Sequence, residues 1–143
     1  MLAANTYPND YIAACRANID RQLSTYRQLI EAAQGQAASQ ARPSAATEFD
    51  LLFFRNLIVL LDAMFVHRTR AREGKDGNPL NEVRMLCESV LKSGDVMTAN
   101  SSIKYDPSKA VLGLRIGDDI RVGEADFTRL AQAFFSTIET RFA

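Results

Sequence analysis

A run of polar residues at positions 67–84, HRTRAREGKDGNPLNEVR, holds the side chains best suited to chemistry. Its basic side chains stand beside three carboxylates, namely Arg68, Arg70, Arg72, Lys75 and Arg84 beside Glu73, Asp76 and Glu82. Guanidinium groups together with free amides at a helix start can bind phosphate or carboxylate. The run therefore predicts a small-anion or partner site at residues 67–82, with these ligand-binding candidates: His67, Arg68, Arg70, Lys75, Asp76, Asn78, Asn81 and Glu82.

The same run suggests a weaker, catalytic alternative. His67 is the one histidine of the chain. Its imidazole could exchange a proton near neutral pH. An enzyme built on it would act on a phosphorylated or carboxylated small molecule, with His67 as the acid/base and Arg68 or Arg70 as the anion clamp.

A structural explanation accounts for the same residues. Basic side chains in the last turn of a helix favour its negative end. Asp76 and Asn78 are typical of a turn followed by a helix cap. On this interpretation the run is only a helix end, a turn and a cap.

Metal and cofactor sites are not expected. With a single histidine there is no His-x-x-x-His pair, and the chain has no Cys-x-x-Cys. The glycines that could cradle a phosphate are dispersed, at Gly113, Gly117 and Gly123. Cys15 and Cys87 occupy apolar positions of expected helices, which is typical of reduced core cysteines.

The charge balance argues against a general nucleic-acid or membrane-surface protein. Lys plus Arg and Asp plus Glu both number 17, so the net charge is zero. Local nucleic-acid binding by the arginine cluster, with Arg115 or Arg121 nearby, is the third functional possibility. The first residues, MLAANTYPND, lack a basic start and an apolar signal run, and we expect a cytoplasmic protein.

Residues 49–67, FDLLFFRNLIVLLDAMFVH, predict a central helix that is apolar on most sides. It is shorter than the roughly 20 apolar residues of a membrane span and contains charges, so it predicts a buried core helix. We expect it to begin after a cap at Thr47, to run to about Glu73 and to end at Gly74. Arg55 and Asp62 lie seven residues apart on one face, where they are either satisfied locally or line a polar pocket.

Three further helices are expected. The first runs from Asn9 or Asp10 to about Gln34 with a narrow apolar stripe, and residues 35–46 form an exposed linker after it. The third begins at Pro79 behind an Asn78 cap and ends near residue 92. The last occupies residues 124–142 and has a wide apolar face.

Alternation of apolar residues predicts an antiparallel β-hairpin just before the last helix. Its strands would be residues 112–116 and 120–122, joined by a turn at 117–119, with another short strand at 103–105. The predicted fold class is therefore mostly α: one domain, residues 1–143, built as a four-helix bundle with a small hairpin.

These expectations favour a non-enzymatic binding or assembly protein. The narrow stripe of the first helix and the wide apolar face of the last helix are hard to cover within one chain of 143 residues. The sequence therefore predicts self-association as a homodimer, with a possible small anionic ligand at residues 67–82.

Overall fold

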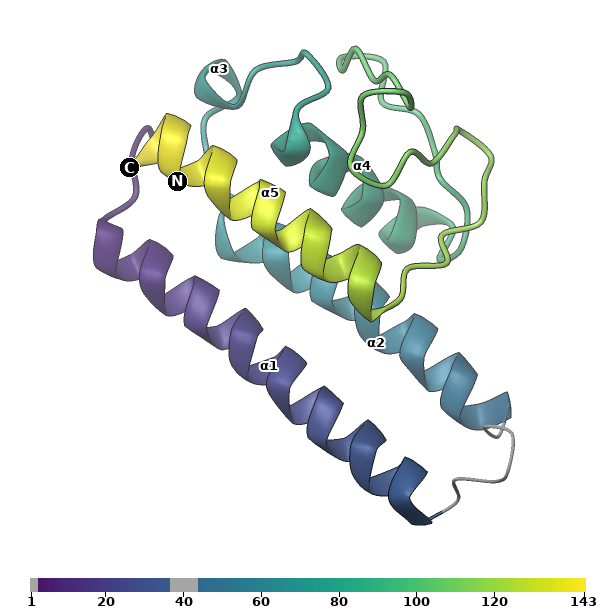
Figure 1. Ribbon diagram of the computed structural model, residues 1–143. Helices are drawn as coiled ribbons and strands as arrows, with labels where there is room; N and C mark the ends of the chain where they lie inside the picture. Colours follow the sequence, from purple (N-terminus) through teal and green to yellow (C-terminus); the bar gives the residue numbers. More distant parts are fainter. Residues whose placement is uncertain (1–2, 37–43) are drawn as a thin grey trace.

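The computed structural model describes residues 3–36 and 44–143, and the regular secondary structure of these residues is helical (Figure 1). In chain order the helices are α1 (Asn9–Gln36), α2 (Ser44–Met64), α3 (Arg70–Glu73), α4 (Pro79–Lys92) and α5 (Glu124–Phe142). The prediction of a mostly α chain is confirmed, and α4 and α5 have the bounds that the sequence predicts.

Helices α1 and α2 run side by side in opposite directions, and α5 lies against both of them (Figure 1). Helix α4 packs against α2 and α5. The start of the chain returns to the end of α5, because the Tyr7 amide donates to the Phe142 carbonyl at 2.7 Å. The far ends of α1 and α2 extend past the first turn of α5 and form a protruding two-helix tip (Figure 1).

Phenylalanine side chains fill the centre of the core. Six of them are almost fully buried: Phe54, Phe65, Phe127, Phe134, Phe135 and Phe142. The α1 stripe is also buried, from Ile12 through Ile19 to Tyr26, together with the apolar face of α5. The two faces from which the sequence predicts a homodimer are therefore covered within one chain.

The central helix is shorter than predicted. It ends at Met64 rather than near Glu73, and α3 follows as a separate helix of four residues. Beyond Met64 the amides of Phe65 and Val66 donate to carbonyls three residues earlier, which tightens the chain into a turn. Leu61 and Phe65 are fully buried, as expected for residues of a core helix, whereas Leu60 in the same helix is only half-buried.

The predicted β-hairpin is wrong. Residues 95–123 contain no strand, and the bridges within the described residues are isolated ones, Ala4 with Arg68 and Val96 with Asp119. The backbone of residues 117–120 bonds to residues 95–97 instead: the Gly117 amide donates to Met97 at 2.8 Å and the Ile120 amide to Asp95 at 2.7 Å. The alternating apolar residues still turn inward, since Ile120 and Val122 are buried.

The segment between α1 and α2 is shorter at both ends than the linker predicted at residues 35–46. Helix α1 continues to Gln36 and α2 already begins at Ser44, while residues 37–43 of the linker lie outside the described residues. In the part of the chain that the structure describes, the helices are too short or too polar to span a membrane.

Candidate functional site

Arg68, a predicted anion ligand, turns into the protein interior. Its side chain is fully buried, and its Nη2 lies 2.7 Å from Oδ1 of Asp62. Its Nε forms an ion pair with Oε1 of Glu73 at 2.8 Å, and Nη1 donates to the carbonyl of Phe65. The guanidinium also lies over the Phe134 ring, 5.6 Å from its centre. These contacts explain why the chain leaves the α2 axis at Met64.

Glu73 is the centre of this buried ion network. Its carboxylate accepts from Arg84, with Nη2 to Oε1 at 2.6 Å and Nε to Oε2 at 3.0 Å. It also accepts from Nδ2 of Asn81 at 2.8 Å. Burial raises the pKa of Glu73, but hydrogen bonds from Arg84 and Asn81 and the charges of Arg68 and Arg84 outweigh it and hold that pKa below its ordinary value. Two arginines thus balance the two carboxylates Asp62 and Glu73.

The start of α4 is capped by the protein itself. Oδ1 of Asn78 accepts from the Leu80 amide at 2.9 Å and from the Asn81 amide at 3.3 Å. These are amides that the predicted anion site would use. The Asn78 amide group also donates to Asp76 at 2.7 Å, the main reason why the pKa of Asp76 is lowered.

The turn before α4 depends on a glycine. Gly77 has a φ of 85°, and a Cβ placed there would approach the Lys104 carbonyl to 2.5 Å. The neighbouring Lys75 carbonyl accepts from the Lys104 amide. Residues 74–78 therefore form a fixed turn against residue 104.

Glu82 faces a different part of the molecule. Its carboxylate is buried and accepts from the amides of Val111 and Leu112 at 2.8 and 2.9 Å. Burial raises the pKa of Glu82, with partial compensation from these two amides and from Arg129. This contact holds the backbone at the start of the predicted strand 112–116, where the Leu112 amide is taken by Glu82 instead of a second strand.

The eight candidate residues therefore divide into two groups. Arg68, Asn78, Asn81 and Glu82 serve internal contacts, as described above, whereas His67, Arg70, Lys75 and Asp76 are exposed. Arg70 donates to the Ser102 hydroxyl at 3.2 Å, and the His67 carbonyl accepts from Ala4. The anion site at residues 67–82 stays a prediction. Its helix-start amides are already bonded to Asn78, and Arg68 is paired with Asp62 and Glu73.

Arg55 and Asp62 are satisfied separately rather than lining a shared pocket. Arg55 donates through Nε and Nη2 to the Ile120 carbonyl at 3.2 and 3.0 Å, and Asp62 pairs with Arg68. Cys15 and Cys87 are buried free thiols, as the sequence predicts.

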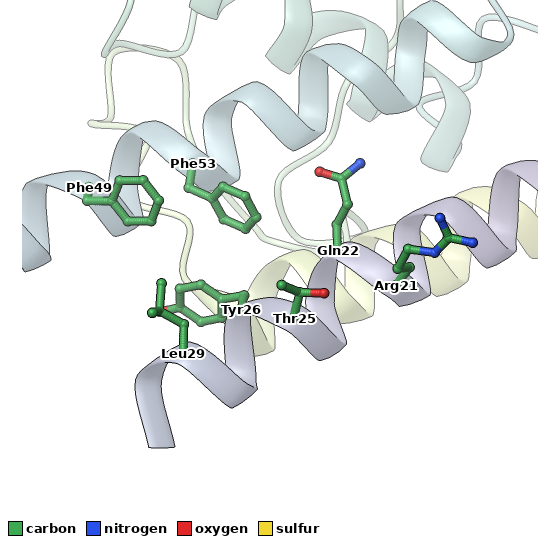
Figure 2. A pocket seen from close by; sticks show the side chains of 7 residues that line it. All are labelled: Arg21, Gln22, Thr25, Tyr26, Leu29, Phe49 and Phe53. Carbon is green, nitrogen blue, oxygen red and sulfur yellow. The ribbon is translucent and has the colours of Figure 1, made fainter. Parts of the chain in front are cut away.

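A second candidate surface lies between the protruding ends of α1 and α2 (Figure 2). There a surface cavity of about 240 Å³ is lined by Arg21, Gln22, Thr25, Tyr26, Leu29, Phe49 and Phe53. Phe53 stacks between Tyr26 and Phe49, with ring centres 5.5 and 5.7 Å away. Polar side chains lie at one end of the cavity and apolar ones at the other (Figure 2).

Apolar side chains around this cavity remain in contact with solvent. Leu29 is 59% exposed, Phe49 48% and Leu52 50%. Sequence reasoning missed this surface because it assigned the whole central helix to the core. Two signals were present: Leu29 lies off the buried stripe of α1, and Phe49 and Leu52 lie opposite the buried Phe54 and Ile58 on α2.

Among residues 3–36 and 44–143, no three histidine, cysteine, aspartate or glutamate side chains come together as metal ligands. Comparison of the chain with protein-family models, curated proteins and solved structures finds no match.

Proposed function

We propose that this chain is a non-enzymatic binding and assembly protein that self-associates through one side of its α1–α2 pair. The observation that carries the proposal is the solvent exposure of Leu29 and Phe49, which line an aromatic cavity, and of Leu52, three residues after Phe49 on α2. Contiguous exposed apolar side chains are typical of interaction surfaces.

This side of the helix pair, here called the outer face, can be defined by helical spacing. Its residues recur at steps of three, four or seven and are exposed or half-buried: Tyr11, Asn18, Gln22, Thr25 and Leu29 of α1, and Phe49, Leu52, Asn56, Leu60 and Ala63 of α2. Each set therefore lies along one side of its helix. The two sets meet at the cavity, which Gln22, Thr25, Leu29 and Phe49 line together.

Burial of the exposed apolar residues supplies the driving force for association. Complete burial of a leucine or phenylalanine side chain is worth about 1.5–3 kcal/mol, and these side chains are now about half exposed. A partner that covered them would also fill the cavity beside Phe53. Association thus gains both apolar burial and packing.

The alternatives receive less support from the contacts. The enzyme would need Arg68 or Arg70 as an anion clamp, and Arg68 is buried between two carboxylates. Nucleic-acid binding would need the arginines on one exposed surface, and both Arg68 and Arg84 are paired with Glu73. A binding role for residues 67–82 would rest on the exposed Arg70 and Lys75.

Light scattering on matched variants tests the proposal. We expect a dimer mass for the wild type at high micromolar concentration and a monomer mass for Leu52→Glu, because a charge there would be buried in the interface. Leu91→Glu is the matched control, since Leu91 is 70% exposed on α4, outside the outer face. A monomeric wild type, or equal loss of association in both variants, contradicts the proposal.

A further inference from the structure

We infer that two copies of this chain meet outer face to outer face around a two-fold axis that runs parallel to α1 and α2. In this arrangement α1 of each copy lies over α2 of the other, and the two protruding tips point the same way. Leu29 then packs against the partner's Phe49 and the partner's Leu52. The inference rests on the proposed self-association and adds which residues meet.

A second copy is the occupant that the charge distribution favours. All ten residues of the outer face are uncharged, in a chain in which 24% of residues are charged. A face that carries a net charge of one sign would repel its own copy, whereas an uncharged face does not. Arg21, the one charged residue among the seven that line the cavity, lies at the edge of this face.

The area of the outer face is sufficient for a specific interface. Tyr11 and Leu29 are 18 residues apart, which corresponds to about 27 Å along a helix. Two helices side by side are about 20 Å wide, so each copy offers roughly 500 Å² of flat area. Together the copies would bury about 1,000 Å², the area at which a biological interface, of the weaker and reversible kind, begins.

Internal contacts fix which residues of α1 and α2 lie side by side, that is, at the same height along the axis of the helix pair. The Tyr26 ring stacks on Phe53, and at the other end of the pair the Tyr11 hydroxyl donates to the Met64 carbonyl. Because the helices are antiparallel, the same pairing places Leu29 at the height of residues 49–52. It likewise places Gln22 close to the height of Asn56.

A two-fold axis parallel to the helices leaves each residue of the second copy at the same height along the helices as the identical residue of the first copy. Leu29 is then brought to the partner's Leu52 and Gln22 to the partner's Asn56, so apolar meets apolar and amide meets amide. Neighbouring helices across the interface are also antiparallel, as in an up-and-down four-helix bundle. An axis across the helices at the middle of the outer face would instead bring the apolar tip toward the opposite end of the partner, where Tyr11 and Ala63 lie.

The contact at the tip can be tested with Leu29. We expect Leu29→Glu to convert the dimer to a monomer in light scattering, with helix content unchanged in circular dichroism because Leu29 is mostly exposed in the single chain. Leu91→Glu again serves as the control that keeps the dimer mass. A dimer that survives Leu29→Glu overturns this arrangement, while the proposed assembly function would stand.

The direction of the axis can be tested with spin labels on cysteines introduced one at a time at Arg21 and Gln28. These positions lie seven residues apart on one side of α1, and the native Cys15 and Cys87 are buried from the label. An axis parallel to the helices gives equal label-to-label distances at the two positions. An axis across the helices makes the two distances differ by up to about 21 Å and overturns the inference. A wild type that is monomeric overturns the assembly proposal itself.

Discussion

Residues 67–84 and the tip of the α1–α2 pair differ in how their side chains are used. The first region carries the one histidine of the chain among nine ionisable side chains in 18 residues, yet Arg68 and Arg84 are neutralised inside the fold by Asp62 and Glu73. The second region looks like ordinary core sequence, yet Leu29 and Phe49 remain in contact with solvent. Residue type thus indicates what a group can do, whereas its contacts decide whether it is free to do it.

The sharpest contrast between the two regions is expected in stability. Glu73→Ala removes the carboxylate that pairs with Arg84 and Arg68, and Arg68 then keeps only its ion pair with Asp62. Loss of one partner of a buried ion pair costs about 3–5 kcal/mol. Leu29→Ala should change the unfolding free energy of the single chain by less than about 0.5 kcal/mol, because Leu29 is mostly exposed.

Urea unfolding of both variants at low protein concentration measures this difference. A small loss for Glu73→Ala would show that the ion network contributes little to the fold. A large loss for Leu29→Ala at a concentration where the chain is monomeric would show that the tip belongs to the core.

Sequence reasoning was accurate where local chemistry decides the structure. The cap at Asn78 with Pro79 behind it predicted the start of α4, and the chain begins the helix there. The break after Met64 could not be predicted, because it depends on the attraction of Arg68 to Asp62 and Glu73, which is a tertiary contact.

The hairpin failed for a similar reason. Apolar alternation at residues 112–122 correctly indicated that side chains such as Ile120 point inward. It carried no information on the backbone partners, which are the Glu82 carboxylate and the backbone of residues 95–97. The candidate site was wrong in a similar way. The sequence placed Arg68 and Glu82 in one site with His67, whereas the fold buries Arg68 and Glu82 and leaves His67 exposed.

Acid provides a second, smaller contrast, within the polar region itself. The pKa of Glu73 is lower in the folded chain than in the unfolded chain, so its contribution to stability is lost as pH falls through the folded pKa. The pKa of Glu82 is raised by burial, so its contribution is present below the unfolded pKa of about 4.3 and is lost as pH rises through the folded pKa. The two carboxyls therefore act in opposite directions on acidification.

We expect Glu73→Gln to flatten the loss of stability between about pH 6 and pH 3, and Glu82→Gln to steepen it. Urea midpoints at several pH values measure both slopes. If the two variants change the slope in the same direction, one of the two assigned pKa shifts has the wrong sign.

The smallest expected effect is that of phosphate on the wild-type protein. Asn78 already occupies the amides of Leu80 and Asn81, so phosphate would have to displace its side chain. We expect little specific stabilisation of the wild type by phosphate at fixed ionic strength.

Asn78→Ala should cost about 0.5–2 kcal/mol through loss of the cap, and it should also free the two amides. Phosphate should then restore part of the lost stability in Asn78→Ala, because an anion at a helix start takes the place of the capping oxygen. Thermal melts of both proteins with phosphate and with chloride measure this difference. If phosphate stabilises the wild type strongly and Arg70→Ala removes that gain, residues 67–82 bind anions as the sequence predicts, and the contrast between a closed polar region and an open apolar tip no longer holds.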